Sequence, residues 1–170
     1  DEESGSEDIA HYYANHPFAP YALSPDADFP VTNIEKAHYS PRFSASWEKT
    51  VSPGVRVLAL DGGIRVNVAP ANCTCLVANA DRTQLEAVLE RVSGETGVSL
   101  TAVYEGNTAK ITAVGVQAHA STPDEGKNAI TATLQALCAL PLAQGTAEKT
   151  VRQLHEIFPY GDNRGKALGI

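Results

Sequence analysis

The sequence predicts an α+β fold in which helices and a sheet form a two-layer α/β sandwich. From about residue 73 onward, apolar runs and helical periodicities alternate in the order strand, helix, strand, strand, helix. A further strand-turn-strand pattern precedes them at residues 42–60. Hydrophobic residues make up 43% of the 170 positions, which is enough to bury the core of about one domain.

The first part of the chain differs in pattern from this sandwich. A short helix is predicted over Ser6–Tyr13, with Ser6 as its N-cap. Four prolines then predict an ordered loop over residues 16–30, and Phe29–Asn33 has the character of a buried strand. We therefore place a domain boundary after residue 34, which gives domains 1–34 and 35–170.

Five segments of the second part are predicted to be strands. Arg42–Glu48 and Val55–Leu60 flank a Pro-Gly turn and predict a hairpin. Cys73–Ala78 is a further apolar run. Val98–Tyr104 and Ala109–Gln117 flank a short Gly-Asn turn and are expected to pair.

Three helices are predicted to cover the sheet. The first begins at Asp81, followed by apolar residues at helical spacing. The second is expected to open with Thr122 as N-cap, Pro123 at its first position and Glu125 as capping-box partner. The third is predicted over Thr146–Phe158, with an apolar face.

Charge and cysteine content restrict the class of protein. The net charge of −7 argues against nucleic acid and anionic membranes as partners. No apolar stretch is long enough to span a bilayer and no signal peptide is evident, so a cytoplasmic location is expected. Cys73 and Cys75 share one side of a strand, which predicts reduced thiols in the core. A zinc knuckle would need a second close pair of ligands, and Cys138 is the one cysteine that remains.

Four residues are candidates for chemistry. His119 stands where a strand is predicted to end and a helix to begin, which suits either an imidazole at a cleft or a partly buried histidine bonded to backbone. Glu2 and Glu3 are adjacent carboxylates, which in extended chain point to opposite sides, so that one can hold a metal while the other acts on a water. The alternative is plain surface charge. Asp26 lies in the proline-rich loop and is either a third carboxylate of the site or a turn residue.

Four motifs in fixed order resemble the dipeptidase V branch of the ArgE/DapE/carboxypeptidase superfamily, whose members are enzymes with two zinc ions. The motifs are DEESGSEDIAHYY at residues 1–13, SPDADFPV at 24–31, GGIRVNVAP at 62–70 and VQAHASTPDEGKNAI at 116–130. The resemblance implies that residues 1–34 form an edge of an α/β zinc-peptidase catalytic domain. Residues 35–170 would then form the first half of a lid domain.

The resemblance also implies a role for five residues. Glu2 corresponds to the general base, and Glu3 to a ligand of one zinc ion. Asp26 corresponds to a ligand of the other zinc ion. His119 corresponds to the lid histidine that stabilises the oxyanion and contacts substrate, and Asn67 to a lid residue near the substrate.

The implied reaction is hydrolysis of a dipeptide. Two zinc ions, with manganese or cobalt as alternatives, would share a water and lower its pKa while Glu2 accepts its proton. Glu2 would then protonate the leaving amine, and one zinc ion together with His119 would stabilise the oxyanion. Lid closure would bring the two domains together.

Several family motifs have no counterpart here, including a His-x-Asp zinc motif, a bridging aspartate and a later zinc histidine. The chain contains no Met and begins at Asp1. We therefore expect an internal fragment whose partner is the remainder of its own catalytic domain. Without that remainder, the fragment is expected to bind zinc weakly and to be inactive. Alternative functions are a deacylase or desuccinylase of the same superfamily, and a non-catalytic module for dimerisation or domain packing.

Overall fold

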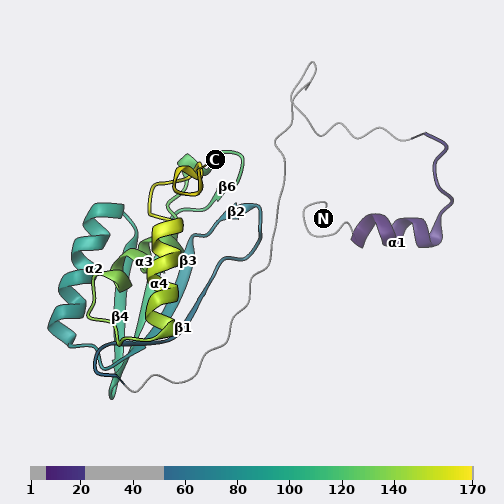
Figure 1. The fold of residues 1–170 in the computed structure, drawn as a ribbon. Coiled ribbons are helices and arrows are strands. Elements are labelled where there is room, and N and C mark those ends of the chain that lie inside the picture. Colours follow the sequence, from purple (N-terminus) through teal and green to yellow (C-terminus); the bar gives the residue numbers. More distant parts are fainter. Residues whose placement is uncertain (1–6, 22–51, 170) are drawn as a thin grey trace. The chain divides into compact units, whose positions relative to one another are not determined.

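The chain divides into two units, residues 1–40 and 41–170, and each is described by itself. The computed structural model describes residues 7–21 and 52–169 (Figure 1). The domain boundary predicted after residue 34 falls outside these residues and stays a prediction. So do the strands predicted at Phe29–Asn33 and Arg42–Glu48.

The described part of the first unit is one helix and the turn after it. Helix α1 spans Glu7–Asn15, with Glu7 and Asp8 in its first turn, where carboxylates favour the positive end of the helix dipole. Beyond the helix, Tyr13 stacks on Phe18 with ring centroids 4.2 Å apart, and Tyr12 stacks on His16 at 4.4 Å. The predicted helix is confirmed, whereas its proposed cap Ser6 lies outside the described residues.

An antiparallel sheet of four strands forms one layer of the second unit. Its order is β1-β3-β5-β4, and the strands span Arg56–Gly62, Asn72–Ala78, Thr108–Val114 and Ser99–Glu105 in that order. Strands β4 and β5 pair along their whole length around the predicted Gly-Asn turn. On β5, Ala109, Ile111 and Ala113 are buried and alternate with more exposed residues, as expected for a sheet with one covered face.

Three helices form the other layer (Figure 1). They are α2 (Arg82–Thr96), α3 (Ala129–Cys138) and α4 (Thr146–Ile157). Helix α3 contacts β3, β5 and both other helices, so it lies at the centre of the layer. The core between the layers includes Leu85, Val92, Ile111, Val77 and Leu137, all fully buried. The predicted α+β two-layer sandwich is therefore the observed fold.

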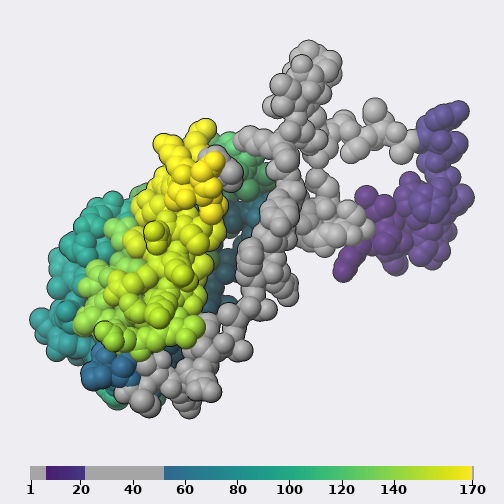
Figure 2. Space-filling view, in the orientation of Figure 1, coloured from purple at the N-terminus to yellow at the C-terminus, as the bar shows by residue number. Residues whose placement is uncertain are grey.

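Helix α4 is only partly covered by the rest of this unit. Val151 is buried, but Leu154, Ile157 and Phe158 of the predicted apolar face are 39%, 37% and 46% exposed. Figure 2 shows α4 and the segment that follows it, in yellow-green and yellow, along one face of the unit. Among the described residues, no helix is long and apolar enough to cross a membrane.

The cysteines are free thiols, as the sequence predicts. Cys73 and Cys75 both point into the core from β3, each 1% exposed. Burial raises the pKa of the Cys75 thiol to about 12, and it also raises the pKa of Cys73. Both are therefore structural residues without nucleophilic character at neutral pH.

The start predicted for the second helix is wrong. Thr122 and Pro123 open a 3-10 helix of three residues, η2 (Pro123–Glu125), and Thr122 makes no side-chain cap bond to its backbone. Helix α3 begins later, where the Asn128 side chain accepts hydrogen bonds from the backbone N–H groups of Ile130 and Thr131. The intervening Gly126 is extended, which ends the first turn before it can continue.

The strand predicted at Ala109–Gln117 is shorter than expected. Strand β5 ends at Val114, and His119 lies on a separate two-residue strand, β6 (Ala118–His119). Its partner is β2 (Val68–Ala69), so these residues form a second small sheet. His119 is therefore neither a continuation of the main sheet nor adjacent to the first turn of a long helix.

Candidate functional site

The small sheet brings together two of the residues singled out from the sequence, Asn67 and His119. Val68 pairs with His119 across the β2–β6 ladder, and the carbonyl oxygen of Asn67 accepts a hydrogen bond from the Ala120 N–H at 2.8 Å. Asn67 directly precedes β2, so its backbone lies beside the end of β6 that carries His119. Asn67 Oδ1 is buried and accepts no hydrogen bond from the described residues.

The ring of His119 is held by Ser121, two residues further along. The backbone N–H of Ser121 donates to Nδ1 at 3.2 Å, and Ser121 Oγ lies 2.7 Å from the same atom. The backbone forms a turn directly after His119, because the Thr122 N–H donates to the His119 carbonyl oxygen at 3.0 Å. His119 is an exposed residue in a fixed local geometry.

A pair of backbone hydrogen bonds closes the segment that carries His119. Val116 and Lys127 form an isolated antiparallel bridge, with N–H to O distances of 3.1 and 2.8 Å. We call residues 116–127 the histidine loop. Gly115 permits the close approach at its neck, because a Cβ there would lie 2.0 Å from the Lys127 carbonyl oxygen. The loop is therefore anchored at its base by backbone contacts that no larger residue allows.

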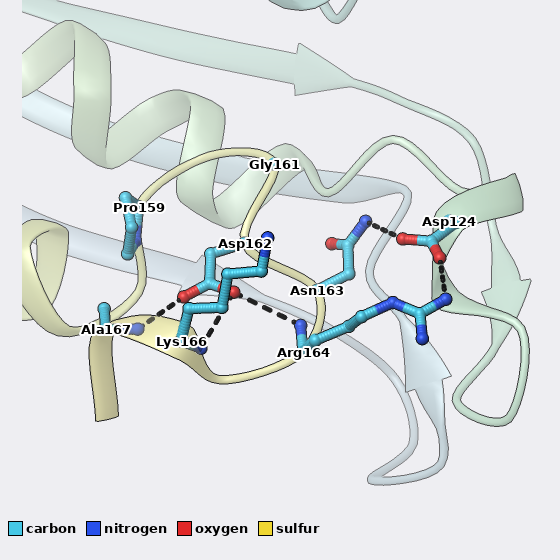
Figure 3. Close-up of a pocket in the computed structure, with 8 residues that line it drawn as sticks. All are labelled: Asp124, Pro159, Gly161, Asp162, Asn163, Arg164, Lys166 and Ala167. Carbon is cyan, nitrogen blue, oxygen red and sulfur yellow. Dashed lines mark hydrogen bonds and ion pairs between the residues drawn. The ribbon is translucent and has the colours of Figure 1, made fainter. Parts of the chain in front are cut away.

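A second anchor comes from the far end of the chain. Asp124, in η2, accepts hydrogen bonds from the Asn163 side-chain amide at 3.0 Å and from the Arg164 guanidinium at 2.8 Å (Figure 3). Residues 159–169, which we call the C-terminal turn, therefore clamp the histidine loop through Asp124. A hollow of about 520 Å³ lies between them. The Asp124 and Arg164 side chains are 55% and 74% exposed, so the ion pair is a surface one.

The C-terminal turn is itself ordered by Asp162. Its carboxylate accepts backbone N–H groups of Ala167 at 2.8 Å, Lys166 at 3.1 Å and Arg164 at 3.3 Å. These bonds, that of Ala167 first, hold the pKa of Asp162 below its ordinary value. Tyr160 ties the start of the turn to the core, since its hydroxyl donates to the Thr96 carbonyl oxygen at 2.7 Å.

The charge of Asp124 is favoured by its two partners. The hydrogen bond from Asn163, and then that from Arg164, hold the pKa of the Asp124 carboxyl below its ordinary value. Asp124 is therefore ionised at neutral pH, and the clamp between the histidine loop and the C-terminal turn is charge-assisted.

The other predicted site residues, Glu2, Glu3 and Asp26, lie outside the described residues. Their proposed roles in base catalysis and metal binding remain predictions. In residues 7–21 and 52–169, no group of three or more His, Cys, Asp and Glu side chains could hold a metal ion. The described part of the chain therefore offers no zinc site of its own.

Sequence reasoning missed three residues that organise the site: Ser121, Asp124 and Arg164. Ser121 had a local signal, because a serine close to a polar side chain often forms a short-range hydrogen bond with it. Asp124 and Arg164 are 40 residues apart. Their pairing depends on how α3 and α4 return the chain, which no local pattern encodes.

Comparison with known protein families gives a match in the second unit. Residues 101–160 match the model of a peptidase dimerisation domain, M20_dimer. This match contains β5, the histidine loop, α3 and α4, while Asn67 lies before it.

Two curated proteins resemble the whole chain. A Beta-Ala-Xaa dipeptidase of Lactobacillus delbrueckii subsp. lactis is 28% identical over 170 residues, which are 99% of this chain and 35% of the relative. The putative dipeptidase YtjP of Bacillus subtilis (strain 168) is 24% identical over 171 residues, covering 100% of this chain and 36% of the relative. The chain thus spans about a third of the length of these relatives. Residues 101–160 thus resemble a peptidase dimerisation domain of the M20 type, and the chain as a whole resembles part of two proteins named as dipeptidases.

Proposed function

We propose that this chain is part of a metal-dependent dipeptidase, with two zinc ions, or manganese or cobalt, in the complete active site. Two relatives with dipeptidase in their names match nearly the whole chain, and M20 peptidases are in general metal-dependent. The observation that carries the proposal is the small sheet that holds Asn67 beside His119. It fixes the backbones of the two residues beside each other, and in this proposal the amide and the imidazole both contact the substrate.

In this proposal the residues divide the work of hydrolysis. The metal, when bound, lowers the pKa of the attacking water. Glu2 accepts the proton of that water and passes it to the leaving amine, while Glu3 and Asp26 each hold one metal ion. His119 donates a hydrogen bond to the carbonyl oxygen as it gains charge, and Asn67 contacts the substrate. The remaining metal ligands come from the rest of the same catalytic domain.

The test is release of amino acids from a dipeptide panel by the full-length protein supplied with zinc, with N-acyl amino acids as a second panel. We expect dipeptide hydrolysis that Glu2→Ala abolishes. His119→Ala should lower kcat by about 10²–10³-fold, the usual cost of losing one oxyanion donor. Lys110→Ala, at an exposed position of β5, is the matched control and should leave the rate unchanged. Cleavage of N-acyl amino acids in place of dipeptides would indicate a deacylase or desuccinylase.

The isolated 170-residue chain is expected to be inactive, because Glu3 and Asp26 would each give one metal ion a single protein ligand. Calorimetric titration should therefore find weak zinc binding. Tight binding of two zinc ions by this chain would contradict the proposed division of the ligands.

A non-catalytic role in dimerisation is the second candidate, favoured by the description of the matching family model. In this case the sandwich would pair with a second copy or with another part of its own protein. Size-exclusion chromatography with light scattering distinguishes the two. A dimer of the isolated chain would support this role, and a strict monomer at high concentration would argue against it.

A further inference from the structure

We propose that Ser121 is a positioning residue that keeps His119 in the tautomer with its proton on Nε2. This inference concerns the state of the imidazole in the folded chain. Its catalytic consequence rests on the proposed dipeptidase function, in which His119 must donate a hydrogen bond.

The argument begins with the two contacts at Nδ1. The backbone N–H of Ser121, 3.2 Å away, can only donate, so this contact favours the tautomer with a lone pair on Nδ1. In a neutral imidazole the proton then belongs to Nε2. The Ser121 hydroxyl can donate or accept, and at 2.7 Å from an unprotonated Nδ1 it donates. Both groups of one residue therefore select the same tautomer.

The geometry around the ring makes this selection effective. The backbone of His119 is fixed on both sides, by pairing with Val68 and by the Thr122 N–H on its carbonyl oxygen at 3.0 Å. The ring can then reorient only about its side-chain bonds. Ser121 restrains rotation about these bonds through its hydrogen bonds to Nδ1. The Nε2–H group then lies on the opposite edge of the ring.

This arrangement has a clear chemical use. An imidazole that stabilises an oxyanion must carry a proton on the nitrogen that faces the substrate, and the other nitrogen must be held by a second group. An Nδ1–H tautomer would present an acceptor at Nε2 and repel a developing negative charge. Ser121 thus prepares the donor before substrate arrives, so that no proton shift is needed during the reaction.

The first test uses the 170-residue chain, labelled with ¹⁵N, and long-range ¹H–¹⁵N correlation of its histidine side chains near pH 8. The protonated and unprotonated ring nitrogens of one fixed tautomer resonate far apart, whereas exchanging tautomers give averaged positions. We expect His119 to show protonated Nε2 and unprotonated Nδ1. Ser121→Ala keeps the backbone N–H but loses the shorter contact of the hydroxyl, so it should move both nitrogens part of the way toward the average. Ser121→Thr, which keeps the hydroxyl, should restore the wild-type pattern.

His155, on α4, serves as the internal control and should be unchanged in every variant. An Nδ1–H tautomer or averaged nitrogens for His119 in the unmodified chain would overturn the proposal. An unchanged His119 pattern in Ser121→Ala would overturn it as well, because the hydroxyl would then have no part in the selection. The measurement on the unmodified chain does not depend on how any variant folds.

The second test measures kinetics in the full-length protein. Ser121→Ala should lower kcat several-fold with little change in KM, and Ser121→Thr should recover most of the rate. If the spectra behave as expected but the protein hydrolyses no dipeptide, the dipeptidase proposal fails and the tautomer assignment stands. If hydrolysis is present and Ser121→Ala leaves kcat unaltered, the positioning role is refuted while the dipeptidase proposal survives.

Discussion

The sandwich and the histidine loop are held in place by different forces. In the sandwich, apolar side chains of the sheet and of α2, α3 and α4 are removed from water, and Leu85, Ile111 and Leu137 are fully buried. The histidine loop buries little. It depends on backbone hydrogen bonds at its neck, on its pairing with β2 and on a surface ion pair. Stability should therefore come from the first region, and the position of His119 from contacts of small individual energy.

The largest expected effect is a cavity in the sandwich. Leu137, on α3, is 0% exposed, so Leu137→Ala should lower the free energy of unfolding by about 2–5 kcal/mol. Urea denaturation of the chain measures it. Val103→Ala is the matched control: Val103 is an apolar residue of β4 that is 69% exposed, and the change should stay within about 0.5 kcal/mol. Similar losses at both positions would mean that the core does not lie between the two layers.

The next effect concerns the neck of the histidine loop. The added methyl group of Gly115→Ala would lie 2.0 Å from the Lys127 carbonyl oxygen, so the two backbones must separate. We expect the free energy of unfolding to fall by about 1–3 kcal/mol, and hydrogen exchange at the Val116 and Lys127 amides to become faster. In Gly94→Ala, on α2, the new methyl group meets nothing within 4 Å. In that control the free energy of unfolding should rise by roughly 0.4–1 kcal/mol.

A smaller effect tests where α3 begins. Asn128 accepts two backbone hydrogen bonds as the N-cap, at 3.0 and 3.2 Å, so Asn128→Ala should cost about 0.5–2 kcal/mol in urea denaturation. Thr122→Ala removes the residue that the sequence favours as the cap. Because its side chain caps no backbone, this change should cost clearly less. A larger loss of stability for Thr122→Ala than for Asn128→Ala would favour Thr122 as the cap and a helix that begins there.

Much of the sandwich could be predicted because its signals are periodic and local. The alternation along Cys73–Ala78 and the spacing of Leu85, Leu89 and Val92 follow from burial of one face. The start of α3 could not be predicted, because Thr122-Pro123 and Asn128 are both plausible caps. In the folded loop Val116 pairs with Lys127, and α3 begins directly after this bridge.

The candidate site was predictable to a lesser degree. The motif resemblance singled out His119 and Asn67, and the structure places His119 on β6 and Asn67 directly before the partner strand β2. Alternation alone assigned His119 to the end of β5, because nothing local indicates that the chain leaves the main sheet after Val114. Contacts such as Asp124 with Arg164 depend on long-range folding.

The smallest expected effect on stability belongs to the clamp between Asp124 and the C-terminal turn. Since the ion pair is exposed, Asp124→Asn should leave the urea midpoint almost unchanged. It should nevertheless shift the amide resonances of the histidine loop, because the clamp positions the loop. Glu90→Gln, at an exposed carboxyl of α2, is the control and should leave these resonances in place.

Salt and acid should act on the same clamp in ways that follow from its charge. Raising salt from about 0.1 M to about 1 M shortens the screening length to about 3 Å, so the wild-type loop resonances should move toward those of Asp124→Asn. The pKa of Asp124 is lowered in the folded chain, so its contribution is complete above the ordinary value of 3.8 and is lost as pH falls through the lowered one. The loop resonances should therefore be constant between about pH 7 and 5 as far as this carboxyl is concerned. Loop resonances that ignore both salt and Asp124→Asn would show that pairing with β2 alone positions His119, and the clamp would then have no part in the site.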